Sequence, residues 1–206
     1  MIPPRSEVFA RTYEGYLQQI QKIDVFAKAD ILGLERRNSS LVIPVYNSEY
    51  IFSHSQLKRG DGQEISIPVQ VIICKYLLTC PLDPGPVPHK LQPFRDFKNA
   101  APLVSHFTNT TTRLLECTFS GRVEELRQRC HNIGGEIQDS EVYDLSCLFY
   151  ALPRIPLLLN YNDRDELFPA NCSILFHLSA ARYLDMECLS MTGTLLADLL
   201  CHKIVD

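Results

Sequence analysis

Polar residues that could do chemistry are concentrated in one short segment, residues 160–169, which reads Asn-Tyr-Asn-Asp-Arg-Asp-Glu-Leu-Phe-Pro. Oxygen-rich loops of this kind suit hard cations such as Mg²⁺ and Ca²⁺. The segment lacks the central glycine and the distal glutamate of a calcium-binding loop, so it does not match that motif closely. A second interpretation uses Asp163 or Glu166 as a general acid or base. The candidate binding residues are Asn162, Asp163, Asp165 and Glu166, with Arg154 or Arg95 expected nearby.

An ordinary turn explains the same residues. Asp and Asn side chains commonly accept hydrogen bonds from nearby amides in turns, including those at the end of a hairpin. The residues by themselves favour this structural interpretation over a site. We also expect Phe168 and Pro169 to anchor the segment, which would suit a binding site and a structural corner equally well.

Cysteine and histidine spacing gives no metal motif. The chain has eight cysteines, and the closest two, Cys74 and Cys80, are six residues apart. Zinc sites usually place two ligands two to four residues apart, and no histidine pair has the spacing of a zinc site. We therefore expect buried free thiols that pack as small apolar groups. A cluster or ion held by several cysteines is a weaker hypothesis, and the residues leave the cofactor unknown.

Composition restricts the class of protein. Of the 206 residues, 46% are hydrophobic and 21% are charged, which is enough to form a core and argues against disorder. The net charge of −4 argues against nucleic-acid binding, which needs a basic face. No apolar run approaches the length of a membrane span. The segment Met1-Ile2-Pro3-Pro4-Arg5 lacks the apolar core of a signal peptide, so we expect a soluble, cytoplasmic protein.

Hydrophobic periodicity predicts a single α+β domain over residues 1–206, with antiparallel hairpins packed against about five helices. Helices are expected from Ser6 to about residue 23, from Pro68 to Cys80, over 103–114, over 123–130, and from Asp185 onward. Strands are expected over 41–45, 49–52, 145–151 and 156–161, with a further short apolar segment over 173–176. The proline-rich residues 81–88 predict a loop that could be an internal boundary.

Three local features refine this prediction. Pro44 removes a backbone donor, so its strand is expected at a sheet edge. The run Thr110-Thr111-Thr112 weakens the helix predicted over 103–114, because β-branched residues disfavour helix. The segment Phe94-Arg95-Asp96-Phe97 is interpreted as a strand with an exposed salt bridge.

The second half of the chain resembles a known family. Four stretches carry the resemblance: residues 151–159 (Ala-Leu-Pro-Arg-Ile-Pro-Leu-Leu-Leu), 165–171, 174–176 and 179–184. They resemble the signature of an uncharacterised prokaryotic domain of unknown function, frequent in anaerobic bacteria and archaea and in some members preceded by an iron–sulfur segment. The resemblance extends from about residue 8 to 203 and is densest over 143–200. This chain has no cysteine-rich iron–sulfur segment, and the resemblance implies no catalytic residues.

Two functions follow as hypotheses. The first is a non-catalytic accessory or interaction domain that binds a protein partner in a redox or corrinoid-type system of an anaerobe. The resemblance motivates it, together with the lack of a catalytic constellation. The alternative is a small-molecule or metal-binding enzyme that uses residues 160–169.

Overall fold

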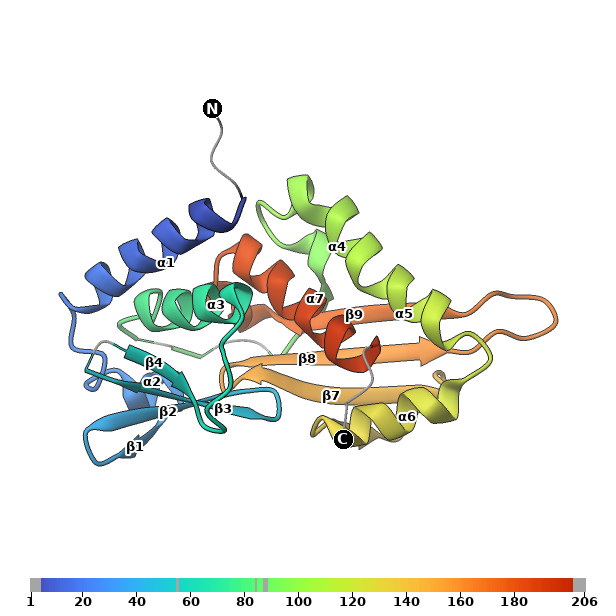
Figure 1. The fold of residues 1–206 in the computed structure, drawn as a ribbon. Coiled ribbons are helices and arrows are strands. Elements are labelled where there is room, and N and C mark those ends of the chain that lie inside the picture. Colours follow the sequence, from blue (N-terminus) through green and yellow to red (C-terminus); the bar gives the residue numbers. More distant parts are fainter. Residues whose placement is uncertain (1–4, 55, 84, 87–88, 202–206) are drawn as a thin grey trace.

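Two antiparallel β-sheets follow one another along the chain (Figure 1). The structure is a computed structural model that describes residues 5–54, 56–83, 85–86 and 89–201, with side chains from residue 12 onward. The strand order is β1-β2-β3-β4 in the first sheet and β5-β9-β8-β7-β6 in the second. All strand pairs are antiparallel, so the α+β class predicted from the sequence is confirmed.

The first sheet is built from short strands and is accompanied by three helices. Its strands are β1 (Glu35–Arg37), β2 (Ser40–Val45), β3 (Ser48–Ser53) and β4 (Gln56–Arg59). The helices are α1 (Arg5–Ile20), α2 (Ala29–Leu32) and α3 (Ile67–Leu78). α3 begins with Pro68 in its first turn, where the missing N–H costs nothing.

The second sheet has long central strands and carries the remaining helices. Its strands are β5 (Leu91–Pro93), β6 (Glu136–Gln138), β7 (Leu145–Leu152), β8 (Ile155–Asn162) and β9 (Asn171–His177). The α-helices are α4 (Val104–Thr110), α5 (Thr112–Phe119), α6 (Val123–Asn132) and α7 (Met186–Cys201). Three 3₁₀ turns complete it: η1 (Phe94–Asp96), η2 (Ala101–Leu103) and η3 (Leu178–Arg182).

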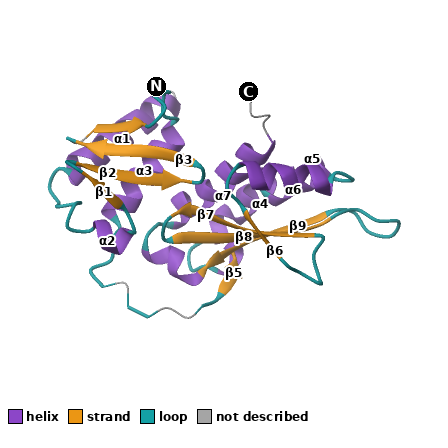
Figure 2. Ribbon diagram, turned by 90° about the horizontal axis from the view of Figure 1, so that it is seen from below, coloured by secondary structure: helices purple, strands orange, loops and turns teal. Residues whose placement is uncertain are grey.

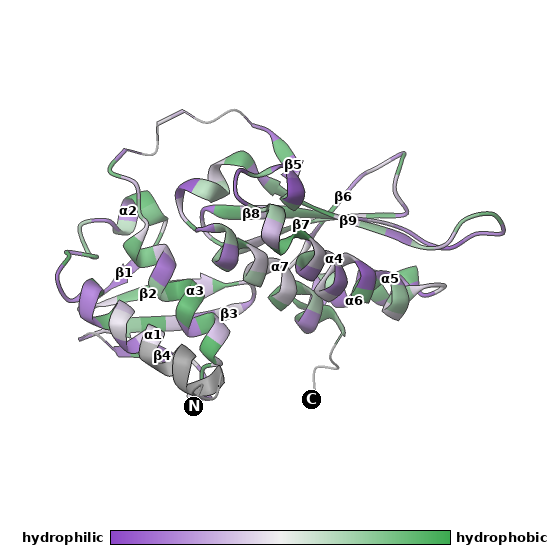
Figure 3. Cartoon of the chain, turned by 90° about the horizontal axis from the view of Figure 1, so that it is seen from above, coloured by the Kyte–Doolittle hydropathy of each residue, from purple (hydrophilic) through white to green (hydrophobic). Residues whose placement is uncertain are grey.

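Helices α4, α5, α6 and α7 lie over one face of the second sheet (Figure 3). Alternation along β7 and β8 explains why, since Cys147, Phe149, Leu157 and Leu159 point to that face and are at most 1% exposed. α7 packs closely because Gly193 leaves room for an aromatic ring. A Cβ added at Gly193 would lie 2.5 Å from Cε2 of Phe107.

One hydrophobic core extends through both sheets. Tyr46, in the turn after β2, joins the first sheet to β7 of the second sheet and to helix α7 by two hydrogen bonds. Its hydroxyl donates to the carbonyl of Thr192 in α7 at 2.7 Å, and its amide donates to the carbonyl of Ala151 in β7 at 3.3 Å. Within the described ranges, no helix has both the length and the hydropathy needed to cross a bilayer.

The helices differ in detail from the five predicted. The helix expected over 103–114 is interrupted at Thr111, whose backbone leaves helical geometry at φ −126° and ψ −91°. The Thr111 hydroxyl donates to the carbonyl of Phe107 at 2.5 Å, a side-chain bond that competes with the helical pattern. The four-residue α2 was not predicted, so the described residues contain seven α-helices.

Two other local predictions are wrong. β2 is an inner strand, not an edge strand, but β1 pairs only with Ser40 to Val42. Pro44 therefore faces no neighbour on that side and its missing donor costs nothing. Residues 94–96 form a 3₁₀ turn where a strand was expected, with the expected exposed ion pair between Arg95 and Asp96 at 3.8 Å.

The other predicted helices and strands are present where the structure describes the residues, although α1 ends at Ile20 and not near residue 23. The predicted helices and hairpins around α3, α6, β2–β3 and β7–β8 are present. Asp185 caps α7, because its Oδ1 accepts from the amide of Cys188 at 2.9 Å. The described part of 81–88 is a loop, whereas Pro84, Val87, Pro88 and the expected helix cap Ser6 lie outside the described residues or side chains.

Close packing at Gly135 yields a prediction for stability. A Cβ there would lie 2.5 Å from Sγ of Cys147 and from Cε1 of Phe149, both fully buried. We expect Gly135→Ala to lower the free energy of unfolding by about 1–3 kcal/mol. The matched control is Gly15→Ala in α1, where nothing lies within 4 Å, and we expect a gain of about 0.5–1 kcal/mol. Urea unfolding of both variants checks this, and equal effects would contradict it.

Candidate functional site

The acidic segment forms the loop between β8 and β9. β8 ends at Asn162 and β9 begins at Asn171, so residues 163–170 connect two antiparallel strands. The hairpin extends beyond the helices, and its loop is the most distant point of the molecule on that side (Figure 1). The tip displays two apolar side chains, Leu167 at 82% and Phe168 at 67% exposure.

Asp165 shapes the tip. Its Oδ1 accepts hydrogen bonds from the amides of Leu167 and Phe168, each at 2.7 Å. Its own amide donates to the carbonyl of Phe168 at 3.0 Å, which closes the turn. The Leu167 amide and then the Phe168 amide favour the ionised carboxylate, so they lower the pKa of Asp165 below its ordinary value. Asp165 therefore holds the two apolar residues in one conformation.

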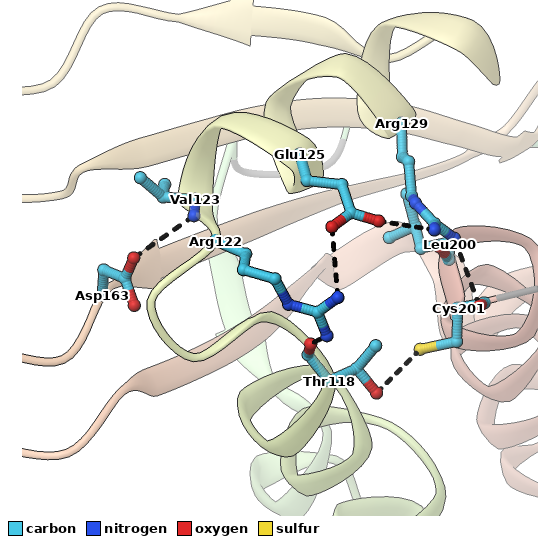
Figure 4. A network of polar contacts seen from close by, with 8 residues as sticks. All are labelled: Thr118, Arg122, Val123, Glu125, Arg129, Asp163, Leu200 and Cys201. Atoms are coloured by element: carbon cyan, nitrogen blue, oxygen red, sulfur yellow. Dashed lines mark hydrogen bonds and ion pairs between the residues drawn. The ribbon is translucent and has the colours of Figure 1, made fainter.

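Asp163 attaches the base of the loop to helix α6. Its Oδ1 accepts from the amide of Gly121 at 2.5 Å. Its Oδ2 accepts from the amide of Val123 at 3.2 Å (Figure 4). Val123 is the first residue of α6, and its amide has no partner within the helix. A carboxylate at this position also interacts favourably with the positive end of the helix dipole.

A second contact fixes the same base to the β6–β7 loop. The amide of Asp163 donates to Oδ2 of Asp144 at 2.7 Å, and Oδ1 of Asn162 accepts from the amide of Asp144 at 3.0 Å. Because this exchange uses both backbone and side chains, the two loops are held side by side. The side chains of Asn162 and Asp163 thus accept hydrogen bonds from backbone amides of neighbouring segments.

α6 is connected in turn to the end of α7 (Figure 4). Arg129 donates to the carbonyl of Leu200 at 2.8 Å and to that of Cys201 at 3.2 Å, which places a cation at a helix C-terminus. It also donates to Glu125 at 2.6 Å, and this bond is the main reason that the pKa of Glu125 is lowered. Arg122 donates to Glu125 and to the carbonyl of Thr118.

Arg154 does not join this loop. It lies in the turn between β7 and β8, at the opposite end of β8, whose eight residues span about 26 Å. Its guanidinium donates to the carbonyls of Asp30 and Ile31, each at 2.9 Å, and so satisfies the end of α2. Arg95 lies in η1 and pairs with its neighbour Asp96. Neither arginine comes near the acidic residues as the sequence had suggested.

Phe168 is not the anchor that the sequence suggested. It is largely exposed, whereas Asp163 and Asp165 anchor the loop through backbone amides. Glu166 is exposed, and no hydrogen bond or ion pair joins it to another described residue. The sequence analysis missed the exposed pair Leu167 and Phe168. The signal for it was Asp165, because an Asp in a turn often accepts hydrogen bonds from the amides two and three residues further on.

The part of the chain that the structure describes contains no group of three His, Cys, Asp or Glu side chains placed to hold an ion. The eight cysteines are free thiols, and six of them are buried. Burial raises the pKa of Cys74 to about 12, so this thiol stays protonated. The prediction of buried free thiols is confirmed for these six residues.

The role of Asp163 can be tested by unfolding. We expect Asp163→Ala to lower the free energy of unfolding by about 0.5–2 kcal/mol, because the amides of Gly121 and Val123 lose their acceptor. Glu166→Ala, at an exposed residue of the same loop, should change it by less than about 0.5 kcal/mol. Denaturant titration measures both, and a loss at Glu166 as large as that at Asp163 would contradict this assignment.

The tip should respond to acid. Because the folded pKa of Asp165 lies below its ordinary value of 3.8, its carboxylate stabilises the turn above about pH 4. That stabilisation is lost as the pH falls through the folded pKa. We expect the amide resonances of Leu167 and Phe168 to titrate together with a midpoint below 3.8. Asp165→Asn should abolish this titration, and a midpoint above 3.8 would refute the proposed hydrogen bonds.

Comparison with known proteins gives one match. Residues 24–199 match the model of the family described as a domain of unknown function (DUF3786). No curated protein and no solved structure matches the chain. The matched residues include the second sheet, helices α2 to α6 and the whole β8–β9 loop. Since the match covers most of the sequence, the chain belongs to the DUF3786 family.

Proposed function

We propose that the chain is a non-catalytic interaction domain whose β8–β9 loop inserts into an apolar recess of a partner protein. The observation that carries this proposal is the exposure of Leu167 at 82% and of Phe168 at 67% on a loop that Asp163 holds at its base and Asp165 holds at its tip. Aromatic side chains that enter a pocket supply much of the affinity of protein interfaces. A loop already held in its bound form loses less entropy on binding.

The charges around the tip suggest the chemistry of the partner. Asp165 and Glu166 precede the apolar pair, and Glu166 has no ion-pair partner among the described residues. A recess flanked by Lys or Arg would match them, and the chain's net charge of −4 would favour encounter with a basic surface. The same charges repel nucleic-acid phosphates, so a protein is the better partner.

The resemblance of residues 143–200 to proteins of anaerobes suggests the kind of system in which the partner acts. The partner would belong to a redox or corrinoid-type system in the cytoplasm. The alternative, a small-molecule or metal-binding enzyme at the same loop, has less support. Backbone amides occupy both oxygens of Asp163, and Arg154 lies at the other end of β8.

Capture from extracts of the native cells tests the proposal. The tagged chain is compared with the double variant Leu167→Ser/Phe168→Ser and with Leu82→Ser, which removes another apolar side chain at 95% exposure. Cross-linked proteins are identified by mass spectrometry. We expect a partner that is retained by the native chain and by Leu82→Ser, and reduced at least about tenfold by the double variant.

The fold should be unaffected, since replacing exposed side chains changes the free energy of unfolding by less than about 0.5 kcal/mol each. The proposal fails if the native chain retains no partner. It also fails if the double variant, still folded by circular dichroism, retains the same partner equally well.

A further inference from the structure

The second sheet has an open face, defined as the side turned away from α4–α7. In Figure 2 the helices α4–α7 lie on one side of β7, β8 and β9, and the open face is the other side. Alternating residues of β7 and β8 point to this face, and Tyr150 among them is 47% exposed. Solvated faces of antiparallel sheets usually carry polar residues. One row of residues on this face departs from that rule.

Three leucines form a continuous row across the open face. Leu148 of β7 pairs with Leu158 of β8, which pairs with Leu175 of β9. All three side chains are half-buried, and none of the positions of β7, β8 and β9 on this face is Lys or Arg. The row is therefore an apolar strip with no covering element among α4–α7.

A hollow of about 420 Å³ opens beside this row. Leu148, Leu158, Leu91 and Tyr143 give it apolar walls. One rim is formed by Gln138, the last residue of β6, and by residues 139–140 of the β6–β7 loop. Its floor is polar, because Ser146 and Asn160 also line it. The hollow therefore combines apolar walls with a small polar group at its base, a combination typical of binding sites.

Asn160 supplies an unused hydrogen-bond donor. The residue is only 3% exposed, and its Oδ1 accepts from the hydroxyl of Ser146 at 2.7 Å. Its Nδ2 has no partner among the described residues. Asn160 lines the hollow, so an acceptor that enters the hollow can take a hydrogen bond from this amide group. The carbonyl of a peptide bond is such an acceptor.

The rim is acidic. Glu136, Asp139 and Glu141 are exposed in β6 and the following loop, and residues 136–144 contain no Lys or Arg. Two cations lie nearby: Lys90, which is exposed next to Leu91, and Arg127, which donates to the carbonyl of Asp144 in the same loop at 2.6 Å. The acidic side chains outnumber these two cations, so an occupant with positive charge beside an apolar stretch complements this site.

We infer that the hollow and the leucine row bind a short segment of a partner protein in which lysine or arginine flanks a leucine-rich stretch. The apolar side chains of the segment pack on Leu148, Leu158 and Leu175. One backbone carbonyl accepts from Nδ2 of Asn160, and the basic side chains reach Asp139 and Glu141. The row crosses three strands, about 10 Å, which exceeds the reach of one small group and favours a polypeptide.

Titration with a synthetic peptide tests this inference. The probe is a short peptide with a leucine centre and lysines at both ends, and two control peptides replace the lysines by glutamates or the leucines by serines. Binding is followed by NMR on the full chain. We expect the lysine–leucine peptide to shift the side-chain amide of Asn160 and the amides of Ser140, Leu148 and Leu158, and both controls to bind at least about tenfold more weakly.

Two variants locate the site. Asp139→Lys/Glu141→Lys should weaken binding of the probe about tenfold. Glu14→Lys/Glu64→Lys makes the same change of net charge at exposed residues elsewhere and should leave the affinity unchanged. Tyr143→Ser, which removes one wall of the hollow, should also weaken binding, and its matched control is Tyr150→Ser on the same face outside the hollow.

Several results would overturn the inference. These are no binding of the probe, equal binding of either control peptide, shifts that map to another surface, or the same affinity in the Asp139→Lys/Glu141→Lys variant. Leu167→Ser/Phe168→Ser should bind the probe as the native chain does. The proposal for the hollow and the proposal for the β8–β9 loop can therefore be refuted independently.

Discussion

Cys147, Phe149, Leu157 and Leu159 reach the covered face of the second sheet because β7 and β8 pair Cys147 with Leu159 and Phe149 with Leu157. A slip of one residue would exchange the two faces of this hairpin and place Ser146 and Asn160 under the helices. The burial of the four apolar side chains excludes that register. The pairing also sets where the ends of the hairpin lie, so it positions the Arg154 turn at one end and the acidic loop at the other.

Much of this arrangement could be predicted from the residues. Alternation along β7 and β8, the proline at the start of α3 and the capping Asp185 are local signals, and each led to the observed element. The β-branched run around Thr111 correctly indicated a weak point in the helix predicted over 103–114. It did not reveal that two helices, α4 and α5, would form, because the bond from the Thr111 hydroxyl to the carbonyl of Phe107 depends on the local geometry of that turn. The inner position of Pro44 depends on the length of β1, which its own sequence does not indicate.

The site could be predicted only in part. Residues 160–169 were correctly located as a loop after a strand, yet the partners of Asp163 lie about forty residues earlier and no spacing rule connects them. Arg154 was grouped with the acidic residues because it is close in sequence, whereas an extended strand carries neighbours far apart. The apolar tip follows from Asp165, which accepts from the amides of the two residues that it displays. In this loop the acidic residues serve mainly to order the backbone.

The contact of Asp163 with Gly121 and Val123 has a consequence for the order in which the chain becomes structured. The first turn of α6 is complete only when β8 has formed and has brought the carboxylate to the helix, so opening of the hairpin exposes the amides of both residues together. Closing this contact fixes a long intervening loop of chain, which is an entropic cost that favours late formation. We therefore expect the hairpin and α6 to open as one cooperative unit, with coupled hydrogen exchange.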